Sequence, residues 1–167
     1  MVILGVDPGS RRTGYGVIER CGGELLRVCA VGVIAPPPRA DLPERIWIIH
    51  QAIAAIVEEH RPEVMAVEDV FHAANARTAI VLGHVRGAIL VAAARFGVAI
   101  CAYPPARVKS ALTGYGQADK RQVAHMVGIH LHLDASTRPA DATDALAVAI
   151  CHAHHAGSAT LLSGATP

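Results

Sequence analysis

Four acidic residues stand where the hydrophobic pattern of the sequence gives no reason for a charge. Asp7 and Glu68 each end a short apolar run. Asp141 and Asp144 lie three positions apart on a predicted helix, so they share one helix face with Cβ atoms about 5–6 Å apart. If the two apolar runs are neighbouring parallel strands, about 4.8 Å apart, Asp7 and Glu68 meet at one edge of a sheet. A helix face above that edge would bring all four carboxylates together.

Such a cluster of carboxylates points to metal chemistry. Like charges in apolar surroundings repel one another unless cations or protons neutralise them. Carboxylate oxygens are preferred ligands of Mg²⁺, and Mn²⁺ can take its place. Two such ions, about 3.5–4 Å apart, can hold the attacking and the leaving oxygen of a phosphodiester displacement. We therefore expect a catalytic site for two Mg²⁺ ions with these ligands: Asp7, Glu68, Asp141 and Asp144.

Three of these acids also have a structural explanation. Asp7 precedes Pro8-Gly9, where an aspartate suits a turn. Asp141 and Asp144 would favour the positive end of a helix dipole. Glu68 gains nothing structural from its position after an apolar strand, so it favours the catalytic explanation most strongly.

A short basic segment is the second chemical signal. Of the 15 basic residues only two are lysines, and both flank the glycine-containing stretch 113–116. Residues 107–121 carry four basic residues and one acid, a net charge of 4 − 1 = +3. Glycines would allow the backbone to approach a phosphate, whereas the alternative is an ordinary solvated helix face. The candidate phosphate-binding residues are Lys109, Lys120, Arg107 and Arg121.

Phe71 is one of only two phenylalanines and follows Glu68 in a polar turn. An exposed aromatic ring beside an acidic site could stack on an unpaired base. The alternative is that the ring packs beneath the following helix.

Composition limits the class of protein. The chain has 167 residues, 52% of them hydrophobic and 17% charged, which favours one folded domain over a disordered chain. Its net charge is 15 − 14 = +1, so any polyanion site must be a local patch. No uninterrupted apolar run approaches the roughly 18 residues of a membrane span. The N-terminus does not resemble a signal peptide, and we expect a cytoplasmic protein that does not bind a membrane.

The cysteines and histidines leave one further question open. The four cysteines form no C-x-x-C pair and are expected to be reduced thiols. The segment Cys151–His155 holds one cysteine and three histidines, which on a helix could form a zinc site. The favoured alternative is a frayed polar helix end.

The apolar pattern predicts an α/β fold with one mixed sheet, in which an antiparallel meander is followed by parallel strands. The predicted strands are Val2–Val6, Tyr15–Ile18, Leu25–Ile34, Glu63–Val67 and Val98–Tyr103. The predicted helices are Glu44–His60, Asn75–Phe96, Ala118–Leu131 and Ala140–His155, and residues 156–167 are expected to form a flexible tail.

The helix Asn75–Phe96 is unusually apolar. Between positions 79 and 94, 12 of 16 residues are Ala, Val, Ile or Leu, so more than one face of the helix is apolar. Either a subunit interface or a central position within one domain would cover these faces.

Together these features closely resemble the RuvC family of bacterial crossover junction endodeoxyribonucleases, the Holliday junction resolvases of the RNase H-like superfamily. The resemblance covers about residues 1–155 and depends on five motifs that follow one another at the expected spacing. The matching segments are Ile3–Ser10 with Thr13–Gly16, Glu68–Phe71, Asn75-Ala76 with Gly87, Pro104–Lys120, and Pro139–Leu146.

The resemblance implies a five-stranded RNase H-like sheet flanked by helices, within a single nuclease domain at residues 1–155. It implies a homodimer, formed through the helix around 75–96, that resolves four-way DNA junctions in recombination and repair by paired symmetrical nicks with 5′-phosphate products. It also implies association with the branch-migration motor complex RuvA-RuvB. The residue roles that it implies are metal binding by Asp7, Glu68, Asp141 and Asp144, DNA contacts by Lys109 and Lys120, and a branch-point position for Phe71.

The family often has a neutral residue where this chain has Asp69, directly after Glu68. Because side chains alternate along a strand, we expect Asp69 to point away from Glu68.

Three alternative functions remain at this stage. The Asp7-x-Gly9 motif also resembles the first phosphate loop of actin-like ATPases and sugar kinases, but those proteins need a second comparable domain. The others are a junction-binding protein without catalysis and an RNase H-like nuclease that acts on RNA.

Overall fold

The computed structural model describes residues 1–22, 25–69, 75–134 and 137–163, and side chains up to residue 156. Its sheet has five strands in the order β3-β2-β1-β4-β5. Strands β1, β2 and β3 are antiparallel neighbours, whereas β4 and β5 are parallel additions beside β1. The predicted mixed α/β fold is therefore confirmed. The strands are β1 (Val2–Asp7), β2 (Thr13–Gly22), β3 (Leu25–Ile34), β4 (Val64–Glu68) and β5 (Ala99–Tyr103).

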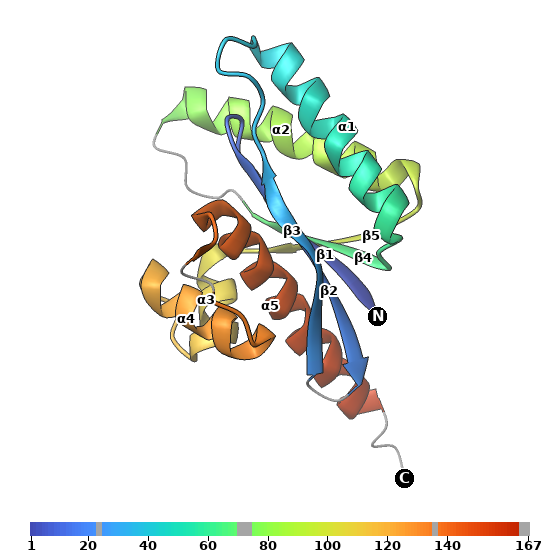
Figure 1. Ribbon diagram of the computed structural model, residues 1–167, viewed down its shortest axis with the longest axis vertical. Helices are drawn as coiled ribbons and strands as arrows, with labels where there is room; N and C mark the ends of the chain where they lie inside the picture. Colours follow the sequence, from blue (N-terminus) through green and yellow to red (C-terminus); the bar gives the residue numbers. More distant parts are fainter. Residues whose placement is uncertain (23–24, 70–74, 135–136, 164–167) are drawn as a thin grey trace.

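Helices cover both faces of this sheet. Helices α1 and α2 lie on one face, and α3, α4 and α5 lie on the other (Figure 1). The helices are α1 (Leu42–His60), α2 (Ala76–Arg95), α3 (Pro105–Thr113), α4 (Lys120–Leu131) and α5 (Ala140–Ser163).

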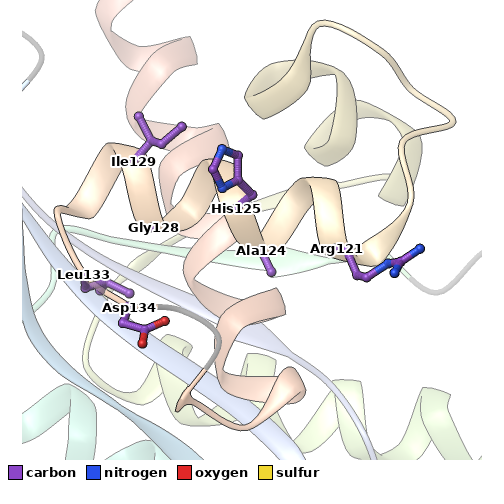
Figure 2. A pocket seen from close by; sticks show the side chains of 7 residues that line it. All are labelled: Arg121, Ala124, His125, Gly128, Ile129, Leu133 and Asp134. Atoms are coloured by element: carbon purple, nitrogen blue, oxygen red, sulfur yellow. The ribbon is translucent and has the colours of Figure 1, made fainter.

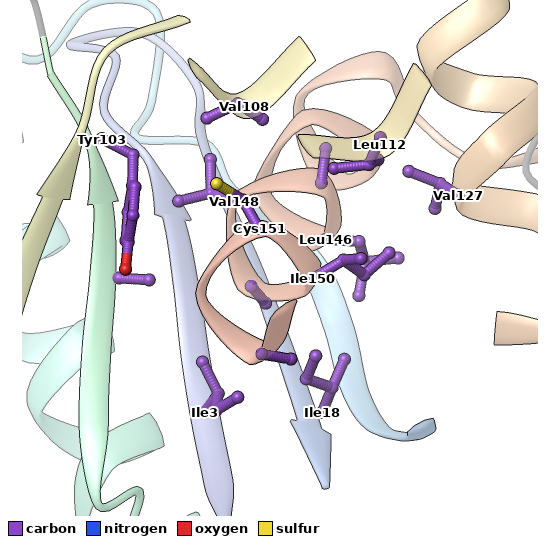
Figure 3. Packing of buried hydrophobic residues seen from close by; sticks show 14 of the residues in the cluster. Ile3, Ile18, Tyr103, Val108, Leu112, Val127, Leu146, Val148, Ile150 and Cys151 are labelled. Atoms are coloured by element: carbon purple, nitrogen blue, oxygen red, sulfur yellow. The ribbon is translucent and has the colours of Figure 1, made fainter. Parts of the chain in front are cut away.

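Strand β1 shows how the sequence pattern divides the core. Successive side chains point to opposite faces, so Leu4 and Val6 pack with α1 and α2, whereas Ile3 packs with α5. Figure 3 shows Ile3 and Ile18 of the sheet facing Ile150 of α5. Strand β1 is buried on both faces of the sheet, so its residues before Asp7 form a continuous apolar run.

Helix α5 crosses the sheet so closely that the strands beneath it need glycine. A Cβ added to Gly5 would lie 2.1 Å from the carbonyl oxygen of Ala145, and one added to Gly14 would lie 1.9 Å from that of Asp141. Both contacts are far shorter than atoms tolerate, so these positions exclude any side chain. The same close packing fixes the start of α5 beside the ends of β1 and β2.

The structure differs from the predicted elements most clearly at one helix end and in one additional helix. Helix α5 continues to Ser163, beyond the predicted end at His155, and the flexibility of residues 156–167 stays a prediction. Helix α3 was not predicted, because Pro104 and Pro105 suggested only the end of a strand. Proline is in fact well suited to a first helical position, where its missing N–H would have no partner.

Helix α2 is both long and apolar. By length and composition alone, it is the one helix in the described part of the chain that could cross a membrane, although no uninterrupted apolar run indicated it. A core helix passes the same test, and α2 buries Val85, Ile89 and Ala93 within the domain.

The contact between α5 and β1 yields a stability prediction. Gly5→Ala should lower the free energy of unfolding by about 2–3 kcal/mol, because the new methyl group must displace the α5 backbone. Denaturant unfolding followed by circular dichroism measures the change. A loss below about 0.5 kcal/mol, the range of an ordinary surface substitution, would contradict the close packing described here.

Candidate active site

Asp7 and Glu68 lie side by side at the carboxyl ends of two parallel strands. The register pairs Val6 of β1 with Val67 of β4, so the next residue of each strand reaches the same edge of the sheet. Side-chain alternation places Asp7 on the face of Gly5, toward α5. The sequence-based prediction that these two acids meet is therefore correct.

Asp7 carries the strongest electrostatic perturbation of the site. Burial raises its pKa to about 8, and the neighbouring charges of Glu68, Asp144 and Asp141 add to the shift. A hydrogen bond from Asp7 to Glu68 stabilises the protonated form of Asp7. Burial and the charge of Asp144 also raise the pKa of Glu68. The two carboxyl groups thus behave as a pair that shares one proton, which resides on Asp7.

Helix α5 brings the other two acids to this edge, and each meets a basic side chain. The Oδ2 atom of Asp141 accepts a hydrogen bond from the Nε of Arg12 at 2.6 Å. The Oδ2 atom of Asp144 accepts one from the Nζ of Lys120 at 2.9 Å. Arg12 could not be predicted from the sequence, because nothing in its loop indicates that it folds beside α5. We call the set Asp7, Glu68, Asp141 and Asp144 the acidic rim.

The acidic rim has the chemistry of a site for hard divalent cations. Its four carboxylates come from three elements, and their mutual repulsion raises the pKa of the most buried member, which a bound cation would relieve. Across the described residues, no three His, Cys, Asp or Glu side chains are arranged to hold one ion. Two of the four acids are engaged by basic side chains, Asp141 by Arg12 and Asp144 by Lys120. The roles of these residues as metal ligands stay a prediction.

A pocket of about 260 Å³ lies beside the rim and joins it to the two lysines. Glu68 and Asp144 line it together with Lys109 of α3 and Lys120 of α4. The hydrogen bond with Asp144 raises the pKa of Lys120, so this side chain stays charged at neutral pH. A reciprocal capping box between Asp119 and Gln122 fixes the start of α4 just before Lys120. The pocket is therefore lined by both positive and negative groups.

The two candidate arginines of this segment lie elsewhere. Arg107 donates a hydrogen bond from Nε to the Nε2 of His155 at 2.9 Å and lies against the ring of Tyr103. Arg121 lines a separate open groove of about 660 Å³ along the outside of α4, with residues such as His125 (Figure 2). Phe71 lies outside the described residues.

The histidine-rich segment of α5 does not form a frayed helix end, so the favoured alternative is wrong. It lies inside the helix and packs against α3 and β5. The Nδ1 of His152 lies 2.8 Å from the hydroxyl oxygen of Tyr103, and the Nδ1 of His155 lies 2.7 Å from the carbonyl oxygen of Cys151. These histidines belong to the packing between elements, and within the described residues no metal-binding group includes them.

Asp69 points away from Glu68, as strand alternation predicts. It forms an ion pair with Arg86 of α2, on the opposite face of the sheet, at 3.5 Å. The additional acid beside Glu68 therefore has its own counter-ion.

Comparison with known proteins identifies relatives over nearly the whole chain. Residues 3–152 match the family described as crossover junction endodeoxyribonuclease RuvC. A protein of that name from Geobacter sp. (strain M21) is 48% identical over 164 residues, which cover 98% of this chain and 99% of the relative.

Solved structures agree with this relationship. The chain resembles T. thermophilus RuvC in complex with a Holliday junction substrate, with a TM-score of 0.90 and 39% identity over 96% of this chain and 97% of the other. It also resembles the yeast mitochondrial Holliday junction resolvase Ydc2, with a TM-score of 0.72 over 95% and 80% of the two chains. At 12% identity the yeast protein shows only the shared fold.

The raised pKa of Asp7 predicts a pH-dependent gain in stability for Asp7→Asn. Without divalent cations, the folded wild type binds a proton on Asp7 that the unfolded chain releases above its ordinary pKa of 3.8. Wild-type stability should therefore fall as the pH rises from about 4 to 8. Asparagine avoids this loss, so the variant should be more stable at pH 9 by on the order of 2 kcal/mol.

Thermal unfolding in EDTA at pH 4 and pH 9 measures this effect. At pH 4 the difference between the two proteins should nearly vanish. An equal difference in stability at both pH values would show that burial and the neighbouring acids do not raise the pKa of Asp7.

Proposed function

The chain belongs to the RuvC family of crossover junction endodeoxyribonucleases, and we propose that it resolves four-way DNA junctions by hydrolysing phosphodiester bonds at the acidic rim. RuvC proteins are metal-dependent nucleases. The observation that supports the rim as the site is the proton-sharing pair of Asp7 and Glu68 beside Asp144, next to the pocket that holds two lysines. If these acids served only to stabilise the fold, their mutual repulsion would work against that role.

The residues of the rim supply the ligands, and the lysines supply countercharge. Asp7, Glu68, Asp141 and Asp144 would hold two Mg²⁺ ions, with Mn²⁺ as a substitute. When bound, such ions lower the pKa of an attacking water and stabilise the 3′-oxygen that leaves, which yields a 5′-phosphate. Lys109 and Lys120 flank Glu68 and Asp144 in the pocket, where they would neutralise the backbone phosphates of the bound strand.

Other contacts with DNA are extensions of this proposal. Phe71 would stack on a base at the branch point, since it follows Glu68 closely in the chain. Arg121 would contact phosphates outside the pocket, because it lies on the exposed side of α4. The pairing of Arg107 with His155 makes it the weakest of these candidates. The same family membership leads us to propose a cytoplasmic location and association with the RuvA-RuvB motor.

A homodimer formed through α2 completes the proposal. Ile80 and Val91 are each 61% exposed and lie on the same helix stripe as Gly87. A Cβ added to Gly87 or to Gly83 would meet nothing within 4 Å, so this stripe is open and narrow enough for close contact with a second helix. Two-fold symmetry would present two acidic rims to a junction that is itself nearly two-fold, which explains paired nicks.

A cleavage assay tests the proposed function. The protein should nick a synthetic four-way junction symmetrically in the presence of Mg²⁺, and not in EDTA, while a linear duplex of the same sequence stays intact. Asp7→Asn should reduce cleavage at least about 10³-fold, because it removes a carboxylate on which the transition-state charge depends, yet it should still bind the junction.

Each alternative gives a different outcome. Binding without nicking by the wild type would indicate a junction-binding protein, and preferential cleavage of an RNA·DNA hybrid would indicate a nuclease that acts on RNA. Full cleavage by Asp7→Asn would exclude the acidic rim as the catalytic site.

A second experiment tests the dimer. Val91→Glu should shift the protein from dimer to monomer in analytical ultracentrifugation, since it places a charge in the apolar stripe. The matched control is Ala55→Glu, an exposed residue on α1 that lies outside the stripe. Dissociation by both variants, or by neither, would contradict an interface through α2.

A further inference from the structure

The loop between β1 and β2 is rigidly closed and carries Arg12. Thr13 is fully buried, and its Oγ1 donates a hydrogen bond to the carbonyl oxygen of Gly9 at 2.7 Å while it accepts one from the N–H of Gly9 at 3.3 Å. A Cβ added to Gly9 would lie 2.1 Å from the carbonyl oxygen of Arg12. The backbone at Arg12 is therefore held in place, immediately before β2 begins at Thr13.

The side chain of Arg12 reaches the acidic rim from the solvent side. Its Nε donates to the Oδ2 of Asp141 at 2.6 Å, and the two side chains are 51% and 31% exposed. A guanidinium has five N–H donors in a planar fork, and this contact uses the one on Nε. The remaining donors can contact a second anion without any change in the backbone of the loop.

Arg12 and a bound divalent cation would compete for the negative charge of the Asp141 carboxylate. A divalent cation that binds the Asp141 carboxylate would compensate the negative charge that holds Arg12 and would repel the guanidinium, so the ion pair would weaken as the cation enters. The charge of Arg12 then lacks a partner at the edge of the site where a DNA strand would pass. The planar fork of arginine matches the geometry of a phosphate.

We infer that Arg12 couples cation binding to DNA binding by exchanging Asp141 for a backbone phosphate. The inference rests on the proposed function, since it takes the rim as the cation site and DNA as the substrate. Without DNA, Arg12 lowers the affinity of the rim for divalent cations. With DNA, the phosphate accepts Arg12 and releases Asp141 for the cation. By linkage, each ligand then strengthens the binding of the other.

A cation titration without DNA tests the first half of the exchange. Arg12→Gln should bind Mn²⁺ about threefold to fivefold more tightly than the wild type in isothermal titration calorimetry, the range expected for loss of a partly exposed ion pair. Arg11→Gln is the matched control, since it removes the same charge from the neighbouring exposed residue. Screening at physiological salt should keep its effect below about 1.5-fold. Equal effects of the two substitutions, or weaker binding by Arg12→Gln, would overturn the inference.

Junction affinity as a function of salt tests the second half. On a junction whose scissile linkages resist hydrolysis, with all four acids of the rim intact, Arg12→Gln should reduce the slope of log K against log salt by about 0.9 in saturating Mg²⁺, the loss of one phosphate contact. In EDTA the slope should hardly change, because Arg12 then stays with Asp141. An unchanged slope in Mg²⁺ would overturn the exchange.

The two tests also separate this inference from the proposed function. Failure of the wild type to cleave junctions would refute the function, whereas the cation titration uses no DNA and reports on Arg12 alone.

Discussion

Repulsion between carboxylates at the carboxyl ends of two parallel strands is the constraint on which the site depends. Burial and three neighbouring acids together raise the pKa of Asp7 to about 8, so the rim holds a proton that an isolated aspartate would lose. Arg12 and Lys120 form ion pairs with the acids of α5, whereas Glu68 receives only partial compensation from the charges of Lys120 and Lys109, and its pKa stays raised. The protein thus keeps a charge distribution that hard cations would relieve, at the expense of stability without them.

The fold maintains this repulsion through backbone packing. The register of β1 and β4 fixes Asp7 beside Glu68, and glycines beneath α5 let the helix approach the sheet closely enough to add Asp141 and Asp144. A side chain at Gly14 would collide with the backbone of Asp141 itself. The geometry of the rim is therefore set by strands and a helix rather than by loops, which would suit the proposed binding of two small ions.

The sequence predicted the elements that obey a clear period and missed those that depend on tertiary contact. Strand alternation and chain order were enough to place Asp7 and Glu68 together and to turn Asp69 toward the other face, where it meets Arg86. Arg12 gave no signal, because its proximity to Asp141 arises only after α5 packs on β2. The histidines of α5 were misread for the same reason: their polar atoms find partners on α3 and β5, which lie far away in sequence.

Direct measurement of bound cations tests the central claim that the four acids form one cation site. Mn²⁺ can be titrated into the protein at pH 7.5 with a four-way junction present, and free Mn²⁺ can be followed by electron paramagnetic resonance. The account predicts two bound ions per chain for the wild type and a loss of at least one of them in Glu68→Gln. Equal Mn²⁺ binding by the two proteins would contradict a shared site, because Glu68 would then hold no ion.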